Sequence, residues 1–191
     1  MKKLSKAQVW DYFILAARIW LAVILIIYGG SKLTGHQFGS SEETMNLPLK
    51  DIDLLRISWY LADHEPFKSF IGISQIIAAI LLIYNRTVIL GALMAIPIWM
   101  NILIWDMSFM GLSTPFTFRM AYYLLLTFLI LWHYKDRIIQ ALQNITKDTA
   151  PKFRYPFWAY LALLPIGFAL ELIWAGPRAL IDLIGRVFRL V

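Results

Sequence analysis

The sequence contains no cysteine, and only 16% of its 191 residues are charged. The absence of cysteine excludes disulfides, iron–sulfur clusters and cysteine-ligated zinc. The low charge sets the chain apart from soluble domains, in which about 25% of residues are charged. Hydrophobic residues make up 60% of the chain, at a mean hydropathy of +0.64, which is more than a soluble fold of this size could bury. These values predict an integral membrane protein.

Histidine is also scarce. The chain has three, and no two of them are spaced three or four residues apart on one helix. This excludes the common helical arrangement of metal ligands and argues against a haem held between two helices. No glycine-rich phosphate loop, nucleophile elbow or HExxH pattern is present. We therefore expect no metal site and no covalently bound cofactor.

The charges that are present are mostly basic, giving a formal net charge of +6 and a pI of about 9.6. Lysine and arginine gather beside the apolar segments, where they hold a protein against anionic lipid. No basic and aromatic module typical of nucleic-acid recognition is visible. The expected partner is therefore membrane lipid, with no nucleic acid.

Five apolar segments approach the ~20 residues needed to cross a bilayer. They cover about residues 11–33, 67–84, 88–110, 116–133 and 157–175. Tight turns join the second segment to the third and the third to the fourth, so these helices are antiparallel neighbours. We expect an all-α fold in a single domain over residues 1–191: a transmembrane four-helix bundle with a fifth transmembrane helix and interfacial amphipathic helices.

The connecting segments differ in character. Residues 34–66 begin as a polar loop and become amphipathic, which predicts a helix lying in the membrane interface. Residues 134–156 form a polar and basic connection. Residues 177–191 predict a basic amphipathic helix on a membrane surface.

The distribution of lysine and arginine favours a cytoplasmic N-terminus. The loop over residues 34–66, which holds six acidic residues, then faces outward. The tail is an exception, because a crossing fifth segment places its three arginines outside. Either this exception is tolerated or the fifth segment is re-entrant or interfacial. Its 19 residues favour a crossing.

Polar residues inside the apolar segments are costly and often functional. The candidates for ligand binding are Arg18, Lys32, Gln75, Asn101, Asp106, Arg119 and Glu171. Four of them, Lys32, Asp106, Arg119 and Glu171, are expected at one level near the outer side, with Gln75 and Asn101 nearer the middle. They indicate either an outward-facing polar pocket for a headgroup, a quinone ring or a small anion, or interhelical ion pairs and snorkelling side chains.

Two stretches of sequence resemble a known family. The first runs from Arg18 to Leu33 and includes the motif Tyr-Gly-Gly-Ser-Lys-Leu. The second runs from Gly72 to Leu82 and is followed by Arg86 and Gly91. Together they resemble the DoxX-like membrane proteins over about residues 12–133.

The resemblance implies a four-helix bundle in the bacterial inner membrane. Some members of the family are subunits of quinone-linked oxidoreductases, such as thiosulfate:quinone oxidoreductase, and others belong to oxidative-stress complexes. Gln75 stands where many relatives carry a glutamate, which argues against a proton-carrying role there. The lack of cysteine argues against a thiol-transfer role like that of the related methylamine-utilisation protein.

Three functions are therefore considered. The first is a membrane subunit of a quinone-linked redox complex, in which Arg18, Gln75, Asn101 and Arg119 shape the site and a redox partner carries the redox centres. The second is a non-enzymatic protein that binds lipid or scaffolds a partner. A small transporter ranks lowest, since no internal repeat or pair of broken helices is evident.

Overall fold

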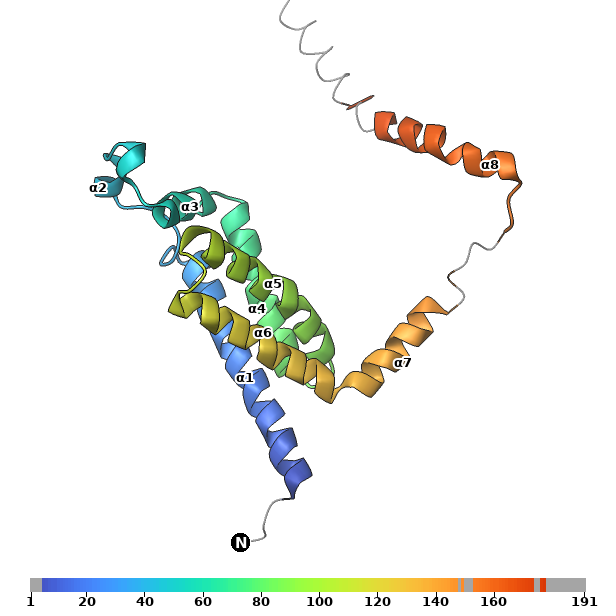
Figure 1. The fold of residues 1–191 in the computed structure, drawn as a ribbon, viewed down its shortest axis with the longest axis horizontal. Helices are drawn as coiled ribbons and strands as arrows, with labels where there is room; N and C mark the ends of the chain where they lie inside the picture. The colour runs from blue at the N-terminus through green and yellow to red at the C-terminus, as the bar shows by residue number, and fades with distance from the viewer. Residues whose placement is uncertain (1–4, 148, 150–152, 174–175, 178–191) are drawn as a thin grey trace, which may run out of the picture. The chain divides into compact units, whose positions relative to one another are not determined.

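The computed structural model describes residues 5–147, 149, 153–173 and 176–177. The described residues are helical with no strands, which confirms the all-α fold (Figure 1). Their contacts divide the chain into two units, residues 1–144 and 145–191. The single domain expected over residues 1–191 stays a prediction.

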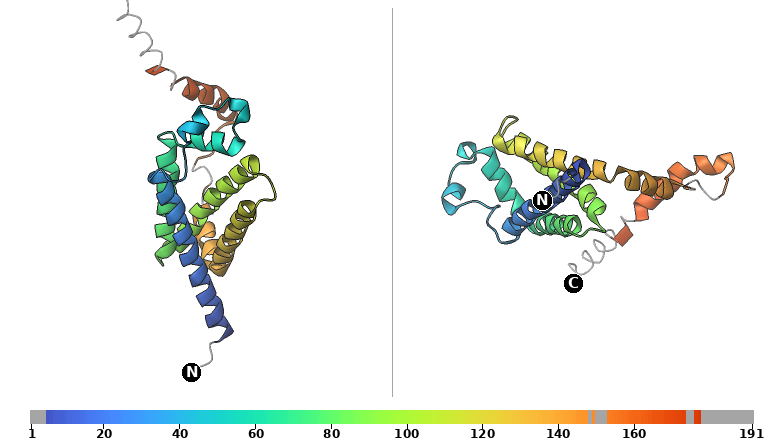
Figure 2. Two further views of the ribbon diagram at one scale, coloured as in Figure 1. Left: turned by 90° about the vertical axis from the view of Figure 1, so that its left-hand side faces the viewer. Right: turned by 90° about the horizontal axis from the view of Figure 1, so that it is seen from below.

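Four long helices form the bundle of the first unit. They are α1 (Lys6–Leu33), α4 (Phe67–Ile83), α5 (Val88–Phe109) and α6 (Pro115–His133), at the positions of the first four predicted spans. Helix α1 packs on α4 and α6, and α5 packs on the same two helices, so the four close into a ring (Figure 2). The end of the bundle where α1 and α5 finish and α4 and α6 begin is called the cap end below.

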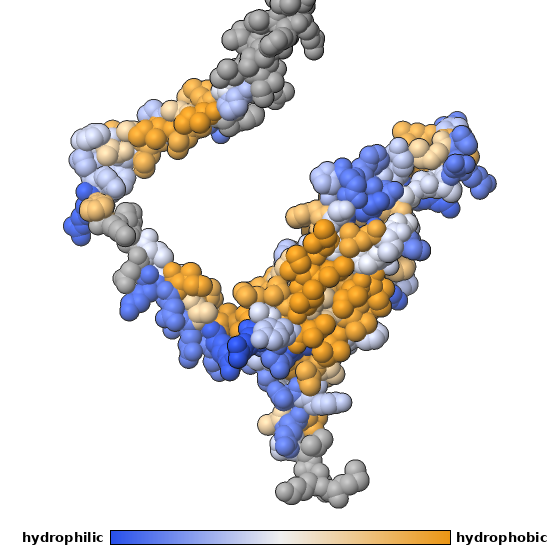
Figure 3. Space-filling view, turned by 180° about the vertical axis from the view of Figure 1, so that it is seen from behind, coloured by the Kyte–Doolittle hydropathy of each residue, from blue (hydrophilic) through white to orange (hydrophobic). Residues whose placement is uncertain are grey.

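The bundle has the dimensions and surface of a membrane protein. Helices α1, α5 and α6 are each long and apolar enough to cross a bilayer. Helix α4 has 17 residues, about 25 Å at 1.5 Å per residue, and passes the same test only together with α3 (Leu54–Ala62), to which it is bent by 85°. On the face drawn in Figure 3, hydrophobic residues cover the bundle between hydrophilic ends. This chain is therefore a multi-pass membrane protein.

Small residues bring the helices close together in the core. Gly29 of α1 lies against Gly72 of α4, and a Cβ atom added to Gly29 would stand 2.7 Å from the Gly72 carbonyl oxygen. Gly91 of α5 meets α4 even more closely, since its Cβ would stand 2.5 Å from the Leu82 backbone nitrogen. Close backbone contact of this kind is how membrane helices pack in the absence of a hydrophobic driving force.

At the end opposite the cap end, α6 is joined to α1 through His133. The Trp10 indole donates a hydrogen bond of 3.1 Å to the His133 Nδ1 atom. The His133 Nε2 atom lies 3.4 Å from a carboxylate oxygen of Asp11. Because Nδ1 accepts, the neutral ring carries its proton on Nε2 and presents it to Asp11.

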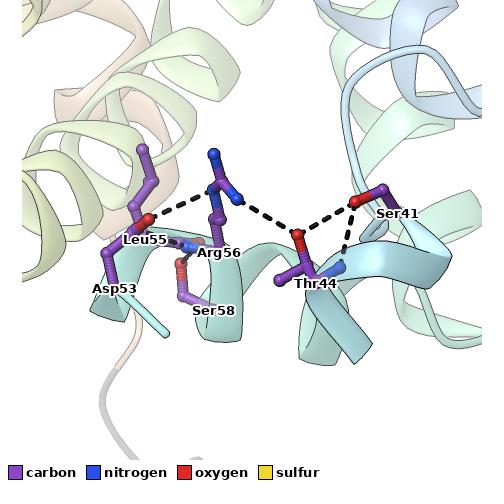
Figure 4. Close-up of polar contacts among 6 residues, drawn as sticks. All are labelled: Ser41, Thr44, Asp53, Leu55, Arg56 and Ser58. Atoms are coloured by element: carbon purple, nitrogen blue, oxygen red, sulfur yellow. Dashed lines mark hydrogen bonds and ion pairs between the residues drawn. The ribbon is translucent and has the colours of Figure 1, made fainter. Parts of the chain in front are cut away.

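Residues 34–66, called the cap below, cover the cap end. They contain α2 (Glu42–Met45), a 3₁₀ turn η1 (Leu49–Asp51) and α3 (Leu54–Ala62), the last confirming the helix expected in this loop. Arg56 ties α3 to α2: it pairs with Asp53 at 3.2 Å and donates to the Thr44 hydroxyl at 3.1 Å (Figure 4). The Ser41 hydroxyl accepts a hydrogen bond from the Thr44 amide at the start of α2, so side-chain hydrogen bonds join α2 and α3.

The segments after α6 complete the described chain. The polar connection expected over 134–156 contains a further helix, α7 (Lys135–Thr146). In the second unit, α8 (Phe157–Leu161) is followed by a turn at Ala162 and further helix to Ile173. These 17 residues fall short of a full span, so the crossing of the fifth segment stays a prediction. The tail expected over 177–191 lies outside the described residues except for Pro177.

Candidate functional site

A cavity of about 450 Å³ lies at the cap end of the bundle. It is lined by α1, α4, α5 and α6, by the segment that follows α1, and by Leu55 and Trp59 of α3, which closes over it. Its volume is within the range of small-molecule sites, about 300–1,000 Å³. This cavity is called the cap-end pocket below.

Lys32 is the buried cation of the cap-end pocket. It lies in the last turn of α1, is 3% exposed, and benefits from the negative end of the helix dipole. Its ammonium donates hydrogen bonds to the Gln37 side-chain oxygen at 2.8 Å and to the Tyr28 carbonyl at 3.4 Å. The Tyr28 and Phe38 rings lie 5.5 and 5.2 Å from it, within cation–π range.

The turn after α1 creates these contacts. The His36 amide donates to the Ser31 carbonyl at 2.8 Å and the Gly35 amide donates to the Lys32 carbonyl at 3.2 Å. These two bonds form a Schellman motif, and Gly35 has the positive φ of 73° that the motif requires. The chain therefore reverses and brings Gln37 and Phe38 back over Lys32.

Asp106 is the acidic member of the cap-end pocket. It is 9% exposed and lies in the last turn of α5, where the helix dipole disfavours a negative charge. It interacts electrostatically with Lys32, but no ion pair within 4.0 Å joins the two. Among the described residues, no group donates a hydrogen bond to its carboxylate. The carboxylate oxygens of Asp106, which lines the pocket, are therefore available to accept hydrogen bonds from a ligand.

The pocket walls are aromatic and apolar, and polar groups gather at one part. Trp59, Trp105, Phe67 and Phe116 contribute ring surface from four different helices. The polar wall residues are Ser31, Lys32, His36, Gln37, Asn101 and Asp106. Four wall residues, His36, Gln37, Phe38 and Trp59, also line an open polar cavity in the cap that includes Asp63, His64 and Glu65. The pocket therefore borders the cavity of the cap along these four residues, two of which, His36 and Gln37, are polar.

The structure brings together three of the seven predicted site residues. Lys32, Asn101 and Asp106 line the same pocket. Glu171 belongs to the second unit, so its role at this site stays a prediction. The remaining three lie elsewhere in the bundle.

Arg18 has partners outside the pocket. It is 4% exposed and donates to the carbonyl oxygens of Leu82 and Ile83 at 3.1–3.2 Å and to the Asn85 side chain at 2.9 Å. Leu82 and Ile83 end α4 and Asn85 follows it, so the guanidinium satisfies the last carbonyls of the helix. Arg18 and Lys32 are 14 residues apart, about 21 Å along α1, and Arg18 does not line the pocket.

Gln75 lies in the interior of the bundle, against Gly29. Its side chain is fully buried, and neither its amide nitrogen nor its amide oxygen has a hydrogen-bond partner. The indole nitrogen of the buried Trp99 is also without a partner. Gln75 does not line the cap-end pocket.

Arg119 is exposed near the start of α6, and its guanidinium lies over the Phe116 ring at 5.3 Å. Phe116 lines the pocket but Arg119 does not. This is the arrangement expected of a snorkelling residue at the interface.

Sequence reasoning missed the residues that hold Lys32, above all Gln37 and Phe38. Their role depends on the reversal at Gly35, which no helical periodicity indicates. The aromatic residues of the pocket wall could not be recognised in the sequence for another reason. Tryptophan and tyrosine are also common at the membrane interface, so their presence does not indicate a pocket. A Thr-Gly pair directly after an apolar helix is the one signal that points to the turn.

The family model for DoxX matches residues 13–106. The chain carries a DoxX domain. The match contains Lys32, Asn101 and Asp106, the three predicted site residues that line the pocket. It confirms the expected family and ends at Asp106, before α6. A relative, the uncharacterised protein YwoB of Bacillus subtilis (strain 168), is 33% identical over 102 residues. That alignment covers 51% of this chain and 65% of YwoB, so the chain spans just under two thirds of its relative. No solved structure matches the chain significantly.

Proposed function

We propose that this DoxX-domain protein is a membrane subunit that binds a quinone in the cap-end pocket. The observation that carries the proposal is the juxtaposition of Lys32 and Asp106 inside an aromatic wall. Trp59, Trp105 and Phe38 offer ring faces against which a flat headgroup can stack. Lys32 can donate a hydrogen bond to a ring oxygen.

The charge of the pocket favours a neutral headgroup. One buried cation and one buried anion face the cavity, so their charges cancel, and a phosphate group would meet Asp106 as well as Lys32. Exposed apolar residues of the lining, including Ile27 and Phe67, provide a route for an apolar tail into lipid. A neutral ring with a hydrocarbon tail is the chemistry of a quinone.

In this proposal the redox centre belongs to a partner protein. The described residues include no group of three or more His, Cys, Asp or Glu side chains placed to hold a metal ion. The chain's own contribution is to orient the ring and to hold it near the membrane surface. The acidic cap, with six acidic and two basic residues over 34–66, is where we place the partner contact.

A second candidate is a lipid-binding or scaffold protein without redox function. Exposed leucines of the cap favour it, since Leu49, Leu54 and Leu61 are each more than half exposed. Such residues offer apolar surface to lipid or to a partner.

The pocket can be tested directly with the full-length protein in mild detergent. A short-chain 1,4-benzoquinone is expected to quench the tryptophan fluorescence, since Trp59 and Trp105 line the pocket. Replacing Lys32 by methionine should weaken binding about tenfold, because a hydrogen bond from a charged donor is lost. Lys6→Met, on the exposed start of the same helix, is the matched control and should bind like the wild type.

Two results would contradict the quinone proposal. One is a wild-type protein that neither binds the probe nor co-purifies with a quinone in a lipid extract. The other is equal binding by the Lys32→Met variant and the wild type. An extract that contains phospholipid and no quinone would favour the second candidate.

We further propose that the protein resides in the bacterial inner membrane with its N-terminus in the cytoplasm. Because the chain has no cysteine, a single engineered cysteine reports its own location. In intact cells, a membrane-impermeant maleimide should label Glu43→Cys in the cap and leave Asn144→Cys unlabelled until the cells are permeabilised. Both positions are exposed and lie in the first unit. The reverse pattern would overturn the orientation.

A further inference from the structure

The two charged groups of the cap-end pocket have opposite hydrogen-bonding roles. A lysine ammonium has three donors and no acceptor, whereas an ionised aspartate only accepts. Two of the Lys32 donors are used by Gln37 and the Tyr28 carbonyl, which leaves a third for a ligand. Asp106, buried to 9% exposure, receives no hydrogen bond from the described residues. The pocket therefore offers one donor and one charged acceptor.

The oxidised and the reduced form of a quinone differ in the hydrogen bonds that they can make with Lys32 and Asp106. A quinone oxygen is a carbonyl and can only accept, so it satisfies Lys32 and leaves Asp106 without a donor. A hydroquinone oxygen is a hydroxyl and can accept from one group while donating to another. A buried carboxylate without a donor is costly, and a hydrogen bond to a charged acceptor is among the stronger ones.

We infer that the cap-end pocket selects the reduced, hydroxyl-bearing form of its ring ligand, with Asp106 accepting the hydroxyl proton in a hydrogen bond and Lys32 donating to a ligand oxygen. This inference rests on the proposed function and adds the redox form of the ligand. Asp106 is therefore the specificity-determining residue of the site. Its place in the last turn of α5, against the helix dipole, agrees with a carboxylate used for binding.

Lys32, the donor of the pair, is tied to the wall that separates the pocket from the open cavity of the cap. His36, Gln37, Phe38 and Trp59 form a wall that the pocket shares with the open cavity of the cap. Gln37, which belongs to this wall, also accepts a hydrogen bond from the Lys32 ammonium, so the wall is directly connected to the cation of the pocket. A bound hydroxyl would lie beside this wall and away from the apolar interior.

The test compares three probes of one ring: a short-chain 1,4-benzoquinone, its hydroquinone, and the dimethyl ether of that hydroquinone. The ether keeps the ring and the oxygen atoms but cannot donate a hydrogen bond. With the full-length protein in detergent under anaerobic conditions, the hydroquinone should bind about tenfold or more tightly than the other two. Equal affinities for the three probes would overturn the inference.

Variants of Asp106 decide whether this residue sets the preference. Asp106→Asn keeps the shape but introduces an amide that can donate to a carbonyl, so the tenfold preference should disappear or reverse. Asp106→Glu keeps the acceptor and should keep the preference, which guards against a variant that fails to fold. Asp51→Asn, at an exposed position of η1, is the control and should behave as the wild type. An Asp106→Asn variant that retains the full preference would overturn the inference.

The two proposals fail in different ways. If no probe binds, the proposed function fails and takes this inference with it. If the benzoquinone binds and the hydroquinone binds no more tightly, the proposed function stands and this inference alone is overturned.

Discussion

Replacing Arg18 by alanine should lower the free energy of unfolding by about 3 kcal/mol or more. The guanidinium donates to the carbonyls of Leu82 and Ile83 and to the Asn85 side chain, at 2.9–3.2 Å. Without it, the end of α4 keeps buried acceptors that lipid cannot satisfy. The loss should be visible as an earlier unfolding transition when the detergent-solubilised protein is titrated with SDS.

Two variants make the Arg18 experiment specific. Arg18→Lys keeps the charge but not the planar fork of donors, so its loss of stability should be intermediate. Arg86→Ala removes an exposed arginine near the same end of α4 and should change stability by less than about 0.5 kcal/mol. If Arg18→Ala unfolds together with the wild type, the guanidinium does not hold the end of α4 in the membrane.

Two adjacent glycines of α1 should respond to alanine in opposite directions. A Cβ atom at Gly29 would stand 2.7 Å from the Gly72 carbonyl oxygen and 2.9 Å from a side-chain carbon of Ile76. The backbone oxygen cannot move alone, so Gly29→Ala should push α1 from α4 at a cost of about 1–3 kcal/mol. At Gly30 nothing lies within 4 Å of the new atom. Gly30→Ala should therefore be neutral or stabilise the helix by up to about 1 kcal/mol.

This pair is its own control, because the two substitutions are chemically identical and one residue apart. Thermal unfolding followed by circular dichroism in one detergent would rank the three proteins as Gly30→Ala at or above the wild type and Gly29→Ala below it. Equal transitions for the two variants would show that the α1–α4 contact is looser than the structure describes.

The bundle helices could be predicted because a membrane imposes simple requirements. Helices must satisfy their own backbone and be about 20 apolar residues long, so the positions of α1, α4, α5 and α6 follow from runs of apolar residues. A tight turn between the second and third segments was expected at residues 85–87, and the structure joins α4 to α5 through residues 84–87. Helix α7 forms no apolar run, and the signal that could have found it is the amphipathic spacing of Ile138, Leu142 and Ile145.

The candidate site was predicted only in part. Helical spacing and depth place Lys32 and Asp106 near one end and Asn101 nearer the middle, and the structure places all three along the wall of the cap-end pocket. The same reasoning could not tell that Arg18 lies outside the pocket. Its partners include backbone carbonyls of another helix. Backbone carbonyls are present at every residue, so no sequence pattern marks the ones that an arginine will find.

By itself, the sequence determined the membrane class, the four helices of the bundle and the family, because apolar length and short motifs are local properties of the chain. The tertiary structure alone decided which polar residues meet. Lys32 is held by Gln37 and Phe38 through a reversal at Gly35, and Asp106 comes from a helix more than 50 residues further on. Such contacts depend on how helices are turned about their axes and how closely glycines let them approach. Those are properties of packing that the order of residues in any one segment does not contain.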